Sequence, residues 1–150
     1  VFVPPDKIFI STGYGVSGAL VQLIAGDERT TTVLVRKNKS MKNHFATSVY
    51  YQGHLYGIDE AILVCLDAAT GKEKWKTRGY VKGSLIIADG HLIILGEIGN
   101  LGIAEATPDA FRAKATHPVF DAKNWTNPSL ADGRIYLRDQ KEIVSFNINQ

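Results

Sequence analysis

An all-β fold built from repeated hairpins is predicted by three features of this 150-residue sequence. Four short segments share one template, in which a turn is followed by a basic residue or His and then by alternating apolar residues. The runs beside these turns are rich in β-branched and aromatic residues, which favour strands. Helix signals are nearly absent. We therefore expect short antiparallel strands joined by tight turns.

The template recurs at an interval that suits one structural unit. It covers residues 5–10, 51–56, 88–93 and 131–136, with Lys7, His54, His91 and Arg134 as its anchors. These anchors recur roughly every 40 residues, which is the length of a four-stranded blade in a β-propeller. The sequence therefore predicts a partial propeller of about three to four four-stranded antiparallel blades, in a single domain over residues 1–150.

Each blade is expected to contain two hairpins. The pairs Gln52-Gly53, Asp89-Gly90 and Asp132-Gly133 supply the positive φ angles that a two-residue hairpin turn needs. In the second unit, residues 62–66 and 72–77 form the next two strands, and residues 68–71 form the turn between them. Four strands joined by three short turns make one blade.

Two stretches are harder to place. Residues 26–42 are polar and rich in Thr, and we interpret them as one strand over residues 31–35 within a long connection. In the third unit, residues 107–115 form either a short helical turn or a decorated turn. Thr107 would cap the helical turn, with Pro108 at its first position.

The segment from Cys65 to Trp75 is the best-formed turn of the chain. Asp67 and Thr70 are expected to hydrogen-bond backbone groups in the turn that Gly71 permits. Trp75 supplies a large flat apolar surface with one N–H donor. It is therefore expected to pack against the neighbouring blade.

This segment resembles the tryptophan-docking motif A-x-D-x-x-T-G-K-x-x-W of the propellers related to pyrroloquinoline quinone (PQQ) enzymes. The match covers Asp67, Thr70, Gly71, Lys72 and Trp75. Residues 42–147 are also similar to bacterial PQQ-binding-like repeat proteins. The resemblance implies the C-terminal portion of a seven- or eight-bladed ring and a periplasmic or secreted location.

Composition narrows the classes of function. The net charge of +2 comes from 17 basic and 15 acidic residues, so the whole chain lacks the basic footprint of a nucleic-acid-binding protein. No apolar run approaches the length of a transmembrane helix. The single Cys excludes an intrachain disulfide. Because the chain begins at Val1 without Met, we expect it to be part of a longer protein.

No catalytic or metal-binding residue is predicted. The stretch from Gly13 to Gly18 matches G-x-G-x-x-G, but no helix of sufficient length follows it, so a Gly-rich hairpin is expected instead of a dinucleotide site. The four His residues lack metal-ligand spacing. No Ser or Cys lies in a nucleophile motif.

One group of polar and aromatic residues is a candidate binding site. Residues just before the first strand of each blade are expected near the mouth of the central channel. This places residues 43–45, 81–83 and 124–126 there, with Asn43, His44, Lys82 and Trp125 as the candidate ligand-binding residues. Amide, imidazole, ammonium and indole groups at one mouth could bind a polar or aromatic ligand. The alternative is that these are loop residues satisfying backbone groups.

Two functions follow from the resemblance. The preferred one is a non-catalytic interaction scaffold without a cofactor, similar to the outer-membrane assembly lipoprotein that shares this repeat. Its partners would be other proteins, the remaining blades or a second copy of the chain. The alternative is part of a dehydrogenase that uses PQQ and calcium to oxidise alcohols or sugars. Such enzymes carry an adjacent Cys pair and a catalytic Asp, and neither can be mapped onto this sequence.

Overall fold

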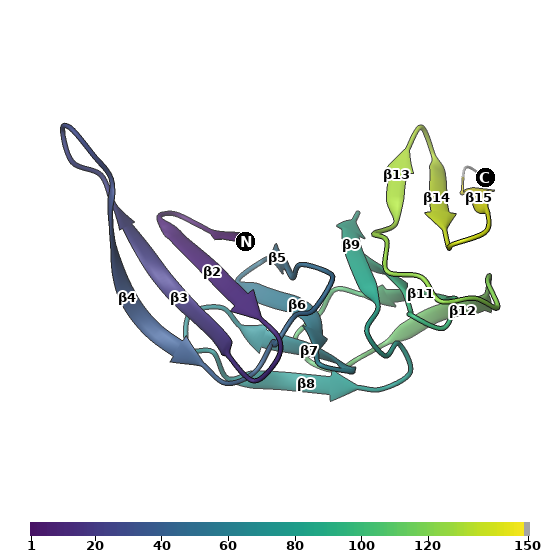
Figure 1. The fold of residues 1–150 in the computed structure, drawn as a ribbon, viewed down its shortest axis with the longest axis horizontal. Coiled ribbons are helices and arrows are strands. Elements are labelled where there is room, and N and C mark those ends of the chain that lie inside the picture. Colours follow the sequence, from purple (N-terminus) through teal and green to yellow (C-terminus); the bar gives the residue numbers. More distant parts are fainter. Residues whose placement is uncertain (149–150) are drawn as a thin grey trace.

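The computed structural model describes residues 1–148, which form fifteen strands in four antiparallel sheets (Figure 1). The first blade contains β1 (Phe2–Val3), β2 (Lys7–Thr12), β3 (Ser17–Ile24) and β4 (Thr31–Asn38). The second contains β5 (Val49–Tyr51), β6 (His54–Asp59), β7 (Ile62–Asp67) and β8 (Glu73–Thr77). The third contains β9 (Ser84–Ala88), β10 (His91–Leu95), β11 (Asn100–Glu105) and β12 (Ala113–Pro118). The fourth contains β13 (Ser129–Ala131), β14 (Arg134–Arg138) and β15 (Ile143–Asn147).

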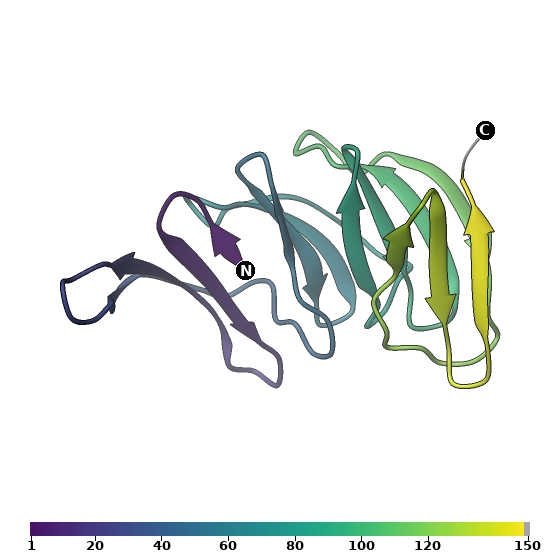
Figure 2. The same cartoon turned by 90° about the horizontal axis from the view of Figure 1, so that it is seen from above.

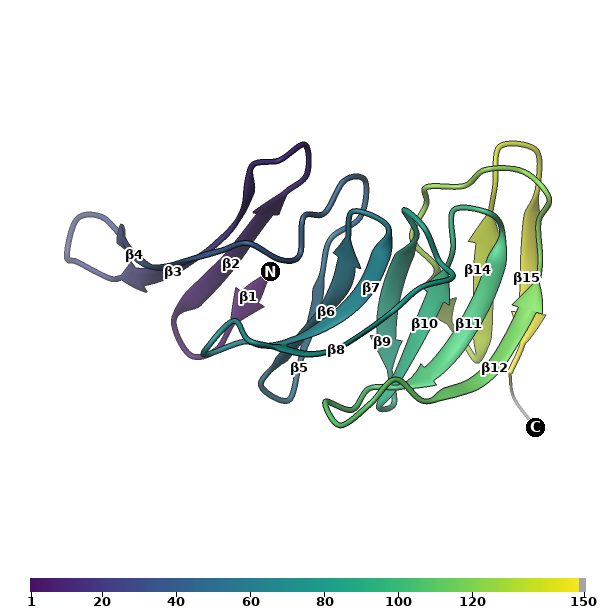
Figure 3. The same cartoon turned by 90° about the horizontal axis from the view of Figure 1, so that it is seen from below.

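The blades stand side by side along an arc. Within each sheet the strands pair in sequence order, and β5, β9 and β13 lie towards the inside of the arc (Figure 1). The views from above and below show neighbouring sheets facing one another (Figures 2 and 3). This arrangement confirms the predicted all-β partial propeller. Across residues 1–148, no helix is long and apolar enough to cross a membrane.

The repeated turn holds the same register in each blade. The anchors Lys7, His54, His91 and Arg134 are the first residues of β2, β6, β10 and β14. Gln52 and Gly53 have φ angles of 45° and 82°, and the pairs at 89–90 and 132–133 also have positive φ. Such turns match the right-handed twist of the strands they connect. The hairpins predicted from the Gly-containing pairs are therefore confirmed.

The first blade differs from the sequence-based expectation. Its fourth strand runs from Thr31 to Asn38 and pairs with β3, so it belongs to the blade and is longer than the expected 31–35 segment. Leu20 pairs with Arg36 and Val21 with Leu34, which leaves Val35 as the extra residue of a bulge in β4, and the ladder continues beyond it to Asn38. The Gly-rich stretch forms the turn between β2 and β3, as expected for a hairpin.

The structure of the third blade decides between the helical turn and the decorated turn predicted for residues 107–115. Residues 107–112 form a bend without helix, and β12 follows and pairs with β11. The decorated turn is therefore the correct alternative. The carbonyl of Thr107 accepts a hydrogen bond from the second blade, as described below.

Three apolar clusters fill the spaces between neighbouring blades. Between the first and second blades the buried residues are Val3, Phe9, Leu20, Met41, Leu55, Val64, Leu66 and Ala68. Between the second and third they are Tyr56, Ile58, Leu63, Cys65, Trp75, Tyr80, Leu85, Leu92, Ile94 and Ala104. Between the third and fourth they are Ile93, Leu95, Leu101, Phe120, Ile135 and Leu137. Strands of the middle blades are apolar on both faces because both faces pack against a neighbour.

The turn before β8 is held by the residues singled out in the sequence. Oδ1 of Asp67 accepts hydrogen bonds from the backbone N–H and the hydroxyl of Thr70, at 2.7 and 2.8 Å. Gly71 has a φ of 73°, and its N–H donates to the carbonyl of Asp67. Hydrogen bonds from Thr70 lower the pKa of Asp67 because they stabilise its charged form. The turn then directs β8 back along β7.

Trp75 joins the second blade to the third. The indole is 8% exposed, and its Nε1 donates a 2.7 Å hydrogen bond to the carbonyl of Thr107. Its ring lies between those of Tyr56 and Phe111, with centroid distances of 5.9 and 5.6 Å. Cys65 lies opposite Trp75 on β7, and burial raises the pKa of its thiol to about 12. Cys65 is therefore a buried packing residue.

Substitution of Trp75 tests this contact. Trp75→Ala removes a buried aromatic ring and should lower the free energy of unfolding by about 3–5 kcal/mol. Trp75→Phe keeps a ring but leaves the Thr107 carbonyl without its donor, which should cost about 1–3 kcal/mol. Urea denaturation followed by circular dichroism measures both. Lys74→Ala, on the exposed neighbouring position, should change the value by at most about 0.5 kcal/mol. An equal free energy of unfolding for Trp75→Ala and the unsubstituted chain would contradict the role of Trp75 in joining the second blade to the third.

Candidate functional site

The candidate site lies where connectors between blades meet turns within blades. The backbone N–H of Glu60, in the β6–β7 turn, donates to the carbonyl of Lys42 in the connector that leads to β5. In the next blade, the N–H of Glu97 donates to the carbonyl of Tyr80, and the carbonyl of Glu97 accepts from Asn124. The second and third blades thus repeat one arrangement, which brings the three connectors to the same end of the sheets.

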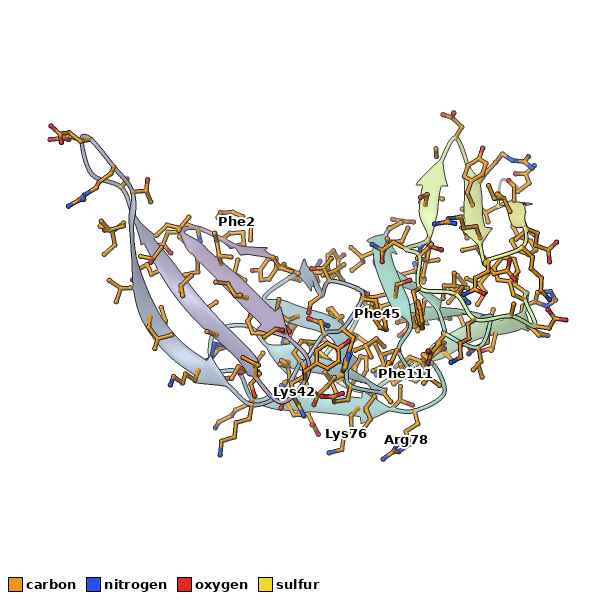
Figure 4. All side chains as sticks on the ribbon, in the orientation of Figure 1. Phe2, Lys42, Phe45, Lys76, Arg78 and Phe111 are labelled. Carbon is orange, nitrogen blue, oxygen red and sulfur yellow. The ribbon has the colours of Figure 1, made fainter. Side chains whose placement is uncertain are left out.

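Four rings from these segments form what we call the aromatic row: Tyr14, His44, Phe45 and Trp125. The centroid distances between successive rings are 4.6, 5.9 and 4.6 Å. Tyr14 is 75% exposed, Phe45 47% and Trp125 43%. Figure 4 labels Phe45, which projects from the connector between the first two blades. The row therefore presents three solvent-exposed rings from the β2–β3 turn and two connectors.

Charged side chains border the aromatic row. The Nζ atom of Lys82 lies 6.0 Å from the centre of the Phe45 ring. Nε2 of His44 hydrogen-bonds Oε2 of Glu60 at 2.5 Å, and this bond lowers the pKa of the Glu60 carboxyl. Lys42 lies 4.0 Å from the other oxygen of Glu60. These contacts fix the position of the His44 ring.

Trp125 is fixed in a similar way. Its Nε1 donates a 2.9 Å hydrogen bond to Oε1 of the buried Glu97, which belongs to the third blade. Beside it, the Asn124 amide donates to the carbonyl of Gly96 at 2.9 Å. The connector between the third and fourth blades is therefore tied to the β10–β11 turn. Trp125 is held against Phe45 with part of its ring in solvent.

Asn43 has a structural position instead of an exposed one. It is buried, its amide nitrogen donates to the carbonyl of Ile58 at 3.0 Å, and its amide oxygen accepts from Ser48 at 2.8 Å. Both ends of the amide are thus occupied by the chain's own groups. For Asn43 the structure matches the alternative in which loop residues satisfy polar groups of the fold.

The structure brings together three of the four residues selected from the sequence. His44, Lys82 and Trp125 surround Phe45, while Asn43 lies beneath them. Phe45 lay in the run 43–45 that was placed at the channel mouth, whereas Tyr14, Glu60 and Glu97 were missed. A signal for the two acids was present, because Glu60 and Glu97 stand at the same distance after the repeat glycines Gly53 and Gly90.

A cavity of about 400 Å³ adjoins the row. It is lined by residues of β2, among them Ser11 and Thr12, and by the connector residues His44, Thr47 and Ser48. Nδ1 of His44 is buried and has no hydrogen-bond partner among residues 1–148. Hydroxyl and imidazole groups therefore lie next to the aromatic surface.

A calcium and PQQ site would need metal ligands and, by the family resemblance, an adjacent Cys pair. Within residues 1–148, no group of three or more His, Cys, Asp or Glu side chains could hold a metal ion. Cys65 is buried, so it cannot contact a cofactor, and it has no adjacent Cys.

Comparison with known proteins supports the fold. No family model matches the chain. No curated protein matches it in sequence. Among solved structures, BamB from Moraxella catarrhalis superposes with a TM-score of 0.63 over 95% of this chain and 46% of that one, at 15% identity.

Two further structures share the architecture. The computationally designed protein Ika8 has a TM-score of 0.62 and 10% identity, covering 86% of this chain and 42% of that one. A europium-containing methanol dehydrogenase has a TM-score of 0.52 and 15% identity, covering 73% of this chain and 23% of that one. The chain thus spans less than half the length of each of these structures. Its fold is that of the β-propellers.

The His44–Glu60 contact gives a prediction for titration. Because the hydrogen bond stabilises the Glu60 carboxylate, His44→Ala should raise the Glu60 pKa towards the ordinary value of about 4.3. A carbon-detected NMR titration measures this directly. In the unsubstituted chain, the lowered pKa of Glu60 increases the free energy of unfolding at pH values above the pKa of this residue in the unfolded chain. This contribution is lost as the pH falls through the pKa of Glu60 in the folded chain.

Glu105 is the matched control for this titration. Lys114 and Arg112 lower its pKa on the outer side of the third blade, and neither contacts His44. The Glu105 pKa should therefore be the same in both proteins. An unchanged Glu60 pKa in His44→Ala would show that the contact does not form in solution.

Proposed function

We propose that this chain is a non-catalytic propeller module that binds a protein partner through the aromatic row. The observation that carries the proposal is the contact between exposed rings from separate connectors, with Phe45 and Trp125 at a centroid distance of 4.6 Å. Neither ring is needed to fill the clusters between the blades. Large exposed rings in fixed positions are typical of binding surfaces.

The composition of the surface supports a protein as the partner. Tyr and Trp bury a large apolar area at a small cost in side-chain entropy, and they dominate the energetics of protein interfaces. Lys42, Glu60 and Lys82 surround the rings with both signs of charge. Such a polar border around an apolar centre is characteristic of protein interfaces. It would orient the partner more than it would add affinity.

The comparisons are compatible with this role. The fold is shared with BamB, and from the family resemblance we infer a bacterial protein in the periplasm or a secreted one. The tryptophan-docking motif has a structural role in this proposal, because Trp75 packs between blades and leaves the connectors to bind. We propose that the chain acts without a cofactor.

Peptide selection provides a test that does not require the partner's identity. A displayed library of random peptides would be selected on the unsubstituted chain, and affinities would be measured by calorimetry. Phe45→Ala and Trp125→Ala should each raise the dissociation constants of the selected peptides at least about tenfold, which corresponds to about 1.4 kcal/mol.

Phe2→Ala is the matched control, because Phe2 is an exposed aromatic residue on the first blade, away from Phe45 (Figure 4). It should leave the affinities unchanged. Selected peptides that bind Phe45→Ala and Trp125→Ala as tightly as the unsubstituted chain would exclude the row as the binding surface. Tight binding of PQQ and calcium with dye-linked dehydrogenase activity in the parent protein would contradict the non-catalytic role.

A further inference from the structure

The outer strand of the first blade has an open edge. In the part of the chain that the structure describes, β4 pairs only with β3, and its other side carries no strand. The β3–β4 hairpin extends beyond β1 and β2 and away from the other blades (Figures 1 and 2). The backbone N–H and C=O groups along this edge are therefore available to another strand.

Apolar side chains on β4 are exposed on both faces of the hairpin. Val33 is 49% exposed, Leu34 53% and Val35 44%. Neighbouring residues of a strand point to opposite faces, so neither face of this stretch is covered. Near the tip, where Leu23 and Ile24 pair with Thr32 and Thr31 beyond the end of β2, the hairpin is a two-stranded ribbon, which is marginally stable in water on its own. A further strand along the edge would extend the sheet and bury part of this surface.

The outer strands of the next two blades carry Lys or Pro within their length, whereas the charged residues of β4, Arg36 and Lys37, lie only near its C-terminal end. In β8, Lys74 and Lys76 flank Trp75, and β12 contains Lys114 and ends at Pro118. Lys and Pro on an outer strand hinder pairing with another chain. By contrast, residues 31–35 read Thr-Thr-Val-Leu-Val, without charge or Pro. Of the outer strands β4, β8 and β12, β4 is therefore the one whose edge is open to pairing with another chain.

The charges of the hairpin identify a second copy as the occupant. Its tip carries Asp27, Glu28 and Arg29, a net charge of −1, whereas Lys37 and Lys39 at the other end give +2. Arg36 is directed towards its own chain, where it donates a hydrogen bond to the carbonyl of Ala68. Antiparallel pairing of two such strands brings each acidic tip to the basic end of the other copy. Parallel pairing would bring like charges together. The two ends of the hairpin are therefore complementary in charge, as the interface of a two-fold dimer requires.

We propose that two copies of this chain form a two-fold dimer by antiparallel pairing of their β4 strands, centred near Thr32. In this register Asp27 of each copy lies opposite Lys37 of the other, and the acidic tip reaches the basic end of the partner's strand. The pairing joins the two first blades into one continuous sheet. The aromatic row contains no residue of β4, so the dimer leaves that surface free.

Sedimentation equilibrium over a range of chain concentrations tests the dimer. Val33→Lys places a charge on the open edge and should raise the dimer dissociation constant at least about tenfold. Ala115→Lys, on the exposed outer strand of the third blade, should leave it unchanged. Near-ultraviolet circular dichroism would establish that both variants fold. An unsubstituted chain that stays monomeric at millimolar concentration would overturn the proposal, as would a dimer that Val33→Lys leaves intact.

A charge exchange tests the antiparallel register independently of Val33. One variant carries Asp27→Lys and Glu28→Lys, and the other carries Lys37→Glu and Lys39→Glu. Each alone should dimerise more weakly, because its tip and its partner's strand end then repel. An equimolar mixture should restore the dimer, since both contacts become attractive again, and added salt should weaken it.

Association through the free face of the first blade would give a different pattern. In that case Phe2→Lys would abolish the dimer. The two charge variants would have the same dimer dissociation constant whether they were measured separately or as a mixture. Either result would overturn pairing through β4. With pairing through β4, Phe2→Lys leaves the dissociation constant unchanged.

Discussion

Face-to-face packing of neighbouring sheets is the constraint on which the rest of this structure depends. Each blade is a small antiparallel meander, and a sheet of that size gains stability by burying its faces. The cluster between the second and third blades joins side chains from both sheets, and Trp75 adds a hydrogen bond to Thr107 across the gap. The angle between blades, and hence the curvature of the arc, follows from how these side chains fit.

The site at the connectors is a consequence of that packing. Phe45 and Trp125 belong to different connectors, and they meet because the second and third blades set the distance between those connectors. Hydrogen bonds to turns of the same blades fix each connector, as Asn43 does with Ile58 and Asn124 with Gly96. The sheets therefore bury their own apolar residues, and the exposed aromatic residues lie on loops between them.

Local features of the fold could be predicted from the sequence, and features that join distant residues could not. Gly53, Gly90 and Gly133 determine turn geometry through their own backbone angles, so the hairpins and their register were predictable. The contact between Phe45 and Trp125 depends on the angle between blades, which no short motif encodes. β4 was predicted too short because Arg36 and Lys37 look like loop residues, although both pair with β3 after a bulge at Val35 of β4.

Native-state hydrogen exchange tests most directly whether the packing between blades holds the structure together. The account predicts that the amides of β6, β7, β10 and β11 exchange slowest and with a common free energy of opening, because they share one buried cluster. Loss of the Trp75 ring should then reduce protection in the second and third blades equally. Independent exchange of the two blades, or loss of protection in the second blade alone, would contradict the account.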